Sequence, residues 1–403
     1  TFDYKPTMVG MDGKTIAVAH ENSVISIFDV ATGKPLRASK GGGLDGDCQK
    51  GSLKTFSVGA PISGLGWSAD GSKLNAVYGE TATFVEFDAR SLDPGKGGCA
   101  HRNRINAIAW SDARDRMAIG AGLHMLAQMT GERGWGDNTV NVFGVGGEMP
   151  LLHRLEGHKL AVLDLDFSPG GELLATASAD RSARLWDMRS GAAVATLTGH
   201  SAEVDSLAFS HDGKYLATAS YDLTVKVWDV AKRAEVATIV TIGPDGHVIE
   251  TPDHYYTASR QGFESVAFRL GPTVVPVELF DLRLNRPDIV LARFGYAPRE
   301  LLDLYEKAHH KRLRKMGLDA AALRPEYHLP TVQILGEVPP STPGRRVELD
   351  VVAEDSRYPL DRLADGAAPG WHLRSARPGA RARGHTASET RRDACGRRDP
   401  PRT

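Results

Sequence analysis

A segment of 42 residues occurs twice in succession in this chain, at residues 157–198 and 199–240. Aligned without a gap, the two copies are identical at 19 of the 42 positions, which is far more than unrelated segments share. A fixed period of this size indicates supersecondary units that stack on one another to bury their apolar faces. The repeat therefore constrains the fold more than any other feature of the sequence.

Each copy has the pattern of four short strands. In the first copy, residues 163–167 alternate apolar and polar side chains as a half-buried strand does, and Pro169-Gly170-Gly171 then turns the chain. Three more strands are predicted at residues 173–178, 183–187 and 193–197. Four antiparallel strands in about 40 residues make one blade of a β-propeller. The predicted fold class is therefore all-β, with stacked propeller blades.

The two copies resemble WD repeats. Both carry the Gly-His and the Trp-Asp dipeptides that mark this family. The resemblance implies that the His, a Ser or Thr, the turn Asp and the Trp of one blade form a buried hydrogen-bonded set with a structural role. The predicted members are His158, Ser178, Asp180 and Trp186 in the first copy, and His200, Ser220, Asp222 and Trp228 in the second.

A Ser, a His and an Asp are also the residue types of a hydrolytic triad. The chain has no G-x-S-x-G elbow and the set recurs once per blade, so a structural role is favoured. The glycine-rich residues 38–52 are expected to be a flexible connection between blades, and residues 123–136 an expanded turn within the third. Both segments lack the phosphate-binding patterns, and Asp45 and Asp47 lack EF-hand spacing. We therefore predict no catalytic residue, no metal site and no cofactor.

Weaker copies of the unit precede the repeated pair. Phenylalanine replaces the marker tryptophan at Phe28, Phe87 and Phe143, and loop insertions lengthen the intervals between them. The buried polar partners are missing from these copies, so we expect packing alone to hold them. Because the family usually closes with about seven blades, we also expect a blade upstream of Thr1. The blades are placed at about residues 2–37, 53–95, 102–155, 157–198 and 199–240, with a degenerate sixth at 243–270.

A second resemblance begins where the repeats end. Residues 251–259, 277–281 and 285–290 resemble the segment after the propeller in bacterial WD-repeat proteins of the caspase-like peptidase family. The resemblance implies a connecting segment at 271–320 and then an immunoglobulin-like β-sandwich, here truncated to 325–363. In such a peptidase the propeller would be the sensor, so the chain would be its non-catalytic N-terminal part.

A helix is predicted at residues 298–316, with Pro298 in its first turn and Gly317 after its end. The run 309–315 is basic, and a solvated last turn favoured by the helix dipole is preferred over a phosphate-binding role. The residues expected on its apolar side are Leu301, Leu304, Tyr305, Ala308 and Leu313.

The composition changes abruptly at Ala364. Residues 364–403 hold nine Arg, eight Ala, five Gly and four Pro but no Val, Ile, Phe, Tyr or Lys. Such a segment cannot bury enough apolar surface to offset its ordering entropy, so we predict that it is disordered. Codons rich in G and C encode these residues in any frame, which suggests the hypothesis that the tail is a frame-shifted read.

The residues around Cys395 superficially resemble a caspase-type nucleophile. A reactive cysteine needs a nearby His base and a rigid strand, whereas no apolar strand precedes Cys395 and His385 lies in the same tail. We therefore exclude catalysis by Cys395. With Cys48 and Cys99 it makes three isolated cysteines, which suit a reducing compartment and neither a disulfide framework nor a zinc site.

Charge and composition bound the function. A net charge of −1 argues against a protein built to hold nucleic acid, except through the Arg-rich tail, and no apolar run of 18 residues exists to span a membrane. A cytoplasmic location is expected. The leading hypothesis is a non-catalytic interaction scaffold or sensor that binds a protein or peptide on the propeller surface. The alternative is a regulatory fragment of a caspase-like cysteine peptidase whose catalytic domain is missing from this chain.

Overall fold

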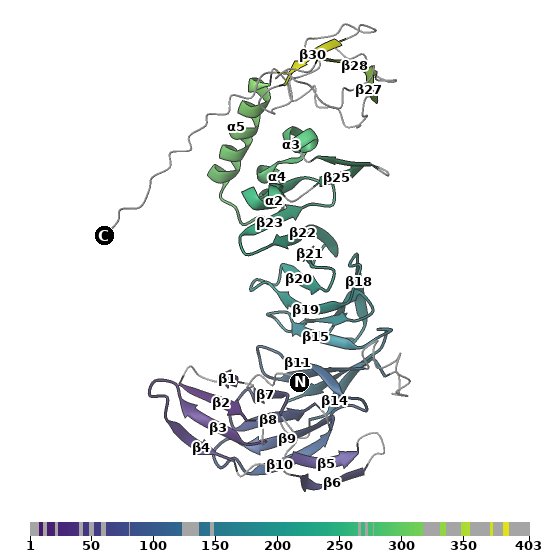
Figure 1. The fold of residues 1–403 in the computed structure, drawn as a ribbon. Coiled ribbons are helices and arrows are strands. Elements are labelled where there is room, and N and C mark those ends of the chain that lie inside the picture. Colours follow the sequence, from purple (N-terminus) through teal and green to yellow (C-terminus); the bar gives the residue numbers. More distant parts are fainter. Residues whose placement is uncertain are drawn as a thin grey trace, which may run out of the picture. The chain divides into compact units, whose positions relative to one another are not determined.

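Antiparallel sheets with strands paired in sequence order recur in the computed structural model (Figure 1). Five of them are named here blades 1 to 5, and the fifth has six strands where the others have four. They confirm the all-β prediction. The described residues are 8–10, 14–20, 23–39, 43–47, 52–57, 62–79, 81–122, 137–145, 149–264, 267–270, 273–276, 278–316, 331–335, 348–354, 371–373 and 382–386.

The strands of the blades have these bounds. Blade 1 consists of β1 (Met8–Gly10), β2 (Thr15–Ala19), β3 (Ile25–Asp29) and β4 (Pro35–Ala38). Blade 2 consists of β7 (Gly64–Trp67), β8 (Lys73–Tyr78), β9 (Thr83–Asp88) and β10 (Pro94–Cys99). Blade 3 consists of β11 (Ile105–Trp110), β12 (Arg116–Ala121), β13 (Val140–Gly144) and β14 (Leu151–Leu155). Blade 4 consists of β15 (Val162–Phe167), β16 (Leu173–Ser178), β17 (Ser182–Asp187) and β18 (Ala193–Thr198). Blade 5 begins with β19 (Val204–Phe209), β20 (Tyr215–Ser220), β21 (Thr224–Asp229) and β22 (Ala234–Ile242).

Short turns with left-handed residues join the first two strands of the blades. Gly171 and Gly213 hold the same position in blades 4 and 5, with φ of 67° and 69°. A side chain with a Cβ is strained in this region of φ, so glycine suits the turn.

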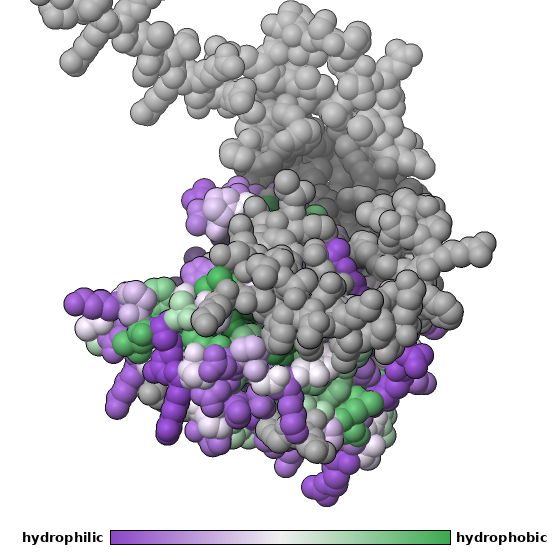
Figure 2. Space-filling view, turned by 90° about the horizontal axis from the view of Figure 1, so that it is seen from below, coloured by the Kyte–Doolittle hydropathy of each residue, from purple (hydrophilic) through white to green (hydrophobic). Residues whose placement is uncertain are grey.

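The outer strand β4 is exposed throughout, and the face seen in Figure 2 mixes hydrophilic side chains with smaller apolar patches.

Apolar side chains of the first strand of one blade pack on the preceding blade. Leu165 and Phe167 of β15 share a buried cluster with Ala107 and Ala109 of β11. In the same way, Leu207 of β19 packs against blade 4. Burial of alternate residues on neighbouring sheets is the arrangement expected of stacked blades.

Two carboxylates add hydrogen bonds between blades 4 and 5. Asp164 Oδ2 accepts from the Ser206 hydroxyl and from the backbone N–H of Leu207, both at 2.8 Å. Asp166 Oδ2 accepts from the Phe209 N–H at 2.8 Å, and burial raises the pKa of this carboxyl. The free edge of β19 is thus partly satisfied by side chains of blade 4.

The segment predicted as a sixth blade instead extends the sheet of blade 5. Strand β23 (Gly246–Glu250) pairs with β22, and β24 (Tyr256–Ala258) pairs with β23. The reason is that β22 continues without a break to Ile242, and Gly243, with φ of 62°, turns the chain directly back onto its outer edge. The prediction of a separate sixth blade at 243–270 was therefore wrong.

Short helices and one hairpin follow blade 5. They are α2 (Arg260–Glu264), the hairpin of β25 (Ala267–Leu270) and β26 (Thr273–Pro276), α3 (Glu278–Leu284), α4 (Pro287–Phe294) and α5 (Arg299–Lys315). Tyr215 of blade 5 donates its hydroxyl to the carbonyl oxygens of Arg293 and Phe294, at 3.0 and 2.7 Å, and so fixes the end of α4 on β20.

Helix α5 lies where the sequence predicts it, but of the five residues expected on its apolar side only Leu313 is buried. Its buried residues are His309 and Leu313, whereas Leu304 is 63% exposed. In the basic run, Arg312 donates to Asp281 Oδ2 at 2.9 Å and to the Asn285 carbonyl at 2.8 Å. The contacts of Arg312 with Asp281 and Asn285 lie on the face that is packed, and the hydrophobic pattern alone does not show them.

One of the two predictions about loops differs from the structure, and the other is not tested by it. Residues 38–52, expected as a flexible connection, contain β5 (Gly43–Asp47), which pairs with β6 (Ser52–Ser57). Glycine does not prevent pairing through backbone groups, which is all that a hairpin requires. The insertion at 123–136 lies outside the described residues.

The second compact unit, Gly317–Thr403, contains one described sheet. Its strands are β27 (Thr331–Leu335), β28 (Glu348–Glu354), β29 (Trp371–Leu373) and β30 (Ala382–Thr386). The predicted immunoglobulin-like sandwich is not confirmed by this single sheet. Two of these strands, β29 and β30, fall in the tail that was predicted to be disordered. Strand β30 pairs with β28 and β29 through backbone groups, and the amino-acid composition of the tail does not reveal such pairing. Cys395 lies outside the described residues.

Cys99, at the end of β10, is disulfide-bonded. This contradicts the interpretation of three isolated cysteines, because spacing along the sequence does not report proximity in the fold. The partner lies outside the described residues. Within the described part of the chain, no helix is long and apolar enough to cross a membrane.

Asn75 on β8 is fully buried, and neither atom of its amide has a hydrogen-bond partner among the described residues. A buried polar group without a partner costs roughly 1 to 3 kcal/mol. We therefore expect Asn75→Leu to raise the stability of the protein by about 1 kcal/mol or more in thermal denaturation. Asn141 is the control. Its Oδ1 also has no partner among the described residues, but its Nδ2 donates to the Ala100 carbonyl at 3.0 Å, and Asn141→Leu would break that bond and should destabilise the protein. Equal effects of the two variants would refute the prediction.

Candidate functional site

The centre of the polar set in blade 4 is Thr176, on β16. Trp186 Nε1 donates to Thr176 Oγ1 at 3.0 Å, and His158 Nε2 lies 2.6 Å from the same oxygen. On its other side, His158 Nδ1 lies 3.0 Å from Asp180 Oδ2. Thr176 is fully buried, and Trp186 and His158 are 2% and 8% exposed. The structure thus brings together His158, Asp180 and Trp186 around a hydroxyl that the sequence analysis did not name.

The directions of these hydrogen bonds follow from the groups available. Asp180 Oδ2 can only accept, so the Nδ1 atom of His158 carries a proton and donates it. The Thr176 hydroxyl accepts from the indole of Trp186 and donates its own proton to His158 Nε2. Every polar atom along the path from Trp186 to Asp180 is therefore satisfied with a neutral imidazole.

Ser178, which was predicted in place of Thr176, closes the turn after β16. Its hydroxyl donates to the Leu160 carbonyl at 3.2 Å and accepts from the Asp180 N–H at 3.1 Å. Side chains two apart on a strand share a face, so the pattern did not separate Thr176 from Ser178. The sequence held one signal, because Thr176 is also identical in the second copy, as Thr218.

Blade 5 repeats the arrangement. Trp228 Nε1 donates to Thr218 Oγ1 at 3.0 Å, His200 Nε2 lies 2.8 Å from that oxygen, and His200 Nδ1 lies 2.9 Å from Asp222 Oδ2. Ser220 again accepts from the N–H of the turn aspartate, at 3.1 Å. The same correction therefore applies to Ser220.

The turn aspartates of both sets are more acidic than ordinary carboxyls. Burial alone would raise the pKa of Asp180, but hydrogen bonds from His158 and Ser182 outweigh it and lower the pKa. For Asp222, hydrogen bonds from Thr224, Ser201 and His200 likewise outweigh burial and lower the pKa. Both carboxylates are thus stabilised in the folded protein.

A loss of stability in acid follows from these lowered pKa values. A group whose pKa falls on folding contributes stability that is present above its unfolded value, about 3.9, and is lost as the pH falls through the folded value. We expect the melting temperature of the protein to decrease once the pH falls below about 4. The variant Asp222→Asn should have a lower melting temperature at pH 7, but its melting temperature should decrease less in acid. The comparison is thermal melts of both proteins from pH 7 to pH 3. Parallel curves would contradict the assignment.

Blade 3 has a variant of the set, although the sequence analysis predicted none. His101 Nε2 lies 3.0 Å from Thr139 Oγ1, which donates to Asp137 Oδ1 at 2.6 Å. Burial lowers the pKa of His101. The hydroxyl here comes from Thr139, two residues after the turn aspartate and immediately before β13, so the motif of blades 4 and 5 does not reveal it.

Loss of the tryptophan is coupled to loss of the hydroxyl in blades 1 to 3. Strand register places Ile119 where blade 4 has Thr176, and Phe143 where it has Trp186. The corresponding pairs are Val18 with Phe28 in blade 1 and Ala76 with Phe87 in blade 2. Each pair loses the donor and the acceptor together, which leaves neither unsatisfied.

The polar side chains of these sets are engaged with one another and are not arranged for catalysis. Their histidines and carboxylates bond to each other, and Ser178 is occupied in its turn. Among the described residues, no group of three His, Cys, Asp or Glu side chains is arranged to hold a metal ion. The geometry is that of a hydrogen-bond network that stabilises a blade.

Apolar side chains are exposed on the turn that the Asp222 set organises. Tyr221 is 61% exposed and Leu223 is 80% exposed, on either side of Asp222. Thr224 donates its backbone N–H and its hydroxyl to Asp222 Oδ1, at 3.0 and 2.7 Å, which fixes the turn. Asp205 and Glu203 raise the pKa of the Tyr221 hydroxyl, so negative charge lies close to it. Tyr221 and Leu223 are named here the turn patch.

Comparisons with known proteins agree with the repeat geometry. The family model described as "WD domain, G-beta repeat" matches residues 149–187 and 191–229. Protein Mut11 of Chlamydomonas reinhardtii is 54% identical over 44 residues, which cover 11% of this chain and 12% of that protein.

Two longer matches are to plant proteins. The B-type cell cycle switch protein ccs52A of Medicago truncatula is 24% identical over 232 residues, covering 44% of this chain and 49% of the relative. Cell division cycle 20.1, cofactor of APC complex, of Arabidopsis thaliana is 24% identical over 192 residues, covering 45% of this chain and 35% of the relative. The chain spans half or less of the length of these curated relatives, and none of the three is named as a peptidase. The family match and the polar sets of blades 4 and 5 together support a WD-repeat protein.

Proposed function

We propose that this chain is a non-catalytic scaffold that binds a protein partner through the turn patch of blade 5. The observation that carries the proposal is that Tyr221 and Leu223 are held in the open by a turn with a fixed hydrogen-bond network. Large apolar side chains fixed in this way form contacts at little cost in conformational entropy. The nearby Asp205 and Glu203 favour a partner with an apolar residue next to a positive charge.

The plant relatives support this class of function. One is named a cell cycle switch protein and another a cofactor of a complex, and the second name describes a protein that acts with other proteins. By analogy, this chain would act as a cofactor subunit of a larger assembly. The analogy covers less than half of the chain, so the partner has to be found by experiment.

Affinity capture with the full chain tests the proposal. The variant Tyr221→Ser/Leu223→Ser removes the turn patch, and Val30→Ser/Leu36→Ser is the matched control, because Val30 and Leu36 are 53% and 50% exposed on blade 1. We expect a defined set of proteins, quantified by mass spectrometry, to be lost with the first variant and kept with the second. Retention of all of them by the first variant would reject the turn patch as the binding surface.

The regulatory-fragment hypothesis stays a prediction that rests on the resemblance of residues 251–290. It predicts that an open reading frame downstream encodes a His and Cys pair of a caspase-like domain, and sequencing of the locus would decide it. Nucleic-acid binding through residues 364–403 predicts steeply salt-dependent binding that disappears when the tail is deleted. A cytoplasmic location likewise stays a prediction, for which cell fractionation is the test.

A further inference from the structure

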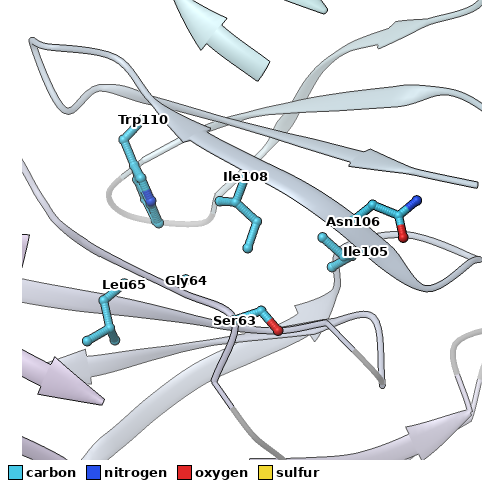
Figure 3. A pocket seen from close by; sticks show the side chains of 7 residues that line it. All are labelled: Ser63, Gly64, Leu65, Ile105, Asn106, Ile108 and Trp110. Atoms are coloured by element: carbon cyan, nitrogen blue, oxygen red, sulfur yellow. The ribbon is translucent and has the colours of Figure 1, made fainter. Parts of the chain in front are cut away.

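A cavity of about 210 Å³ lies between the first strands of blades 2 and 3 (Figure 3). Ile108 and Trp110 point from β11 toward β7, where Gly64 and Gly66 face them. A Cβ on Gly66 would lie 2.3 Å from the indole of Trp110, and one on Gly64 would lie 2.7 Å from Ile108 Cδ1. The two glycines are therefore required for this interface, and they leave Ile108 and Trp110 partly exposed.

Polar groups lie at one end of the cavity. Ser63 and Asn106 hold the same position in blades 2 and 3, immediately before the residues that face between the blades, and both are exposed. The Gly79 N–H donates to Ser63 Oγ at 3.0 Å, which leaves the hydroxyl proton to be donated. Asn106 Nδ2 donates to the Gly122 carbonyl at 2.9 Å, which leaves the amide oxygen to accept. One donor and one acceptor match the backbone carbonyl and the backbone N–H of a single residue.

We propose that this cavity binds one large apolar side chain of an extended peptide segment from a protein partner. The volume is below the roughly 300 to 1,000 Å³ of sites for drug-sized ligands, so it suits one side chain and not a nucleotide or other cofactor. Ile105, Ile108 and Trp110 supply the apolar wall. Both β7 and β11 are edge strands of their sheets, so unpaired backbone groups lie beside the cavity for an extended peptide to use.

The two neighbouring interfaces explain why the cavity occurs at this point. Ala107 and Ala109 fill the same positions in blade 3, and Asp164 and Asp166 fill them in blade 4. Between blades 2 and 3 no side chain projects from these positions, and Ile108 and Trp110 pack directly against the backbone of Gly64 and Gly66. The cavity is distinct from the turn patch of blade 5, so the two binding surfaces are tested separately.

The experiment is a titration of the full-length protein, labelled at isoleucine δ1 methyl groups, with N-acetyl-leucinamide followed by NMR. We expect saturable shifts of the Ile105 and Ile108 signals with a Kd on the order of a millimolar, given the ligand efficiency of such a small molecule. N-acetyl-glycinamide, which lacks an apolar side chain, should give no saturable shift of these signals.

Two variants make the titration decisive. Ser63→Phe places a ring at the exposed end of the cavity and should weaken binding at least tenfold, whereas Leu163→Phe, at the same strand position of blade 4, should leave the Kd unchanged. Ser63→Ala, which preserves the volume, should weaken binding by a few-fold through loss of the hydroxyl. Absence of saturable shifts in the wild-type protein, or an unchanged Kd in Ser63→Phe, would overturn the proposal.

Discussion

Replacing Trp186 by alanine is expected to lower the free energy of unfolding by about 3 to 5 kcal/mol. The indole is 2% exposed and packs in a buried cluster with residues of blades 3 and 4. Its loss leaves a cavity in that cluster and removes the indole N–H that donates a hydrogen bond to Thr176 Oγ1. The change should show as a lower midpoint in urea denaturation followed by circular dichroism.

A matched control separates this effect from a general effect of substitution. Leu151, on the outer strand of blade 3, is 52% exposed, so Leu151→Ala should change stability by no more than about 0.5 kcal/mol. Because repeat proteins can lose one unit before the others, hydrogen exchange should show the loss concentrated in blades 3 and 4. An unchanged midpoint for Trp186→Ala would show that blade 4 is not built around this residue.

The repeat made blades 4 and 5 readable from the sequence because each strand carries its own alternation and each turn its own glycine or aspartate. Strand β16, for example, has the bounds that the pattern predicts. The polar set was readable only in part. His158, Asp180 and Trp186 each follow from the motif, whereas the choice between Thr176 and Ser178 depends on where the indole nitrogen points across the strand. That direction comes from strand register, which the sequence does not specify.

Features that depend on contacts distant in the sequence were not readable. On α5 the hydrophobic pattern predicted the burial of Leu313 but not that of His309 or the ion pair of Arg312 with Asp281. The disulfide of Cys99 and the extension of blade 5 by β23 belong to the same class, because both follow from which edges and side chains meet in space. Such contacts leave little signal in local periodicity.

The coupled loss of Trp and Thr in blades 1 to 3 leads to the second large prediction, on Thr176→Val. The substitution keeps the shape of the side chain but leaves the Trp186 N–H and His158 Nε2 buried without partners. Two unsatisfied buried groups should together cost roughly 2 to 4 kcal/mol of stability in urea denaturation. Thr176→Ser, which keeps the hydroxyl, should recover most of this loss.

A double-mutant cycle with Trp186→Phe then tests whether the two residues act as a unit. Phe at position 186 has no indole N–H to satisfy, so the double variant Thr176→Val/Trp186→Phe recreates the combination of Val18 with Phe28 found in blade 1. Its loss of stability should be smaller than the sum of the single losses by about 1 to 3 kcal/mol. His158 Nε2 still lacks its partner, so the double variant should remain less stable than the wild type. Additive losses would mean that the shared hydroxyl does not couple the tryptophan to the threonine, and that the joint absence of the two from blades 1 to 3 has another cause.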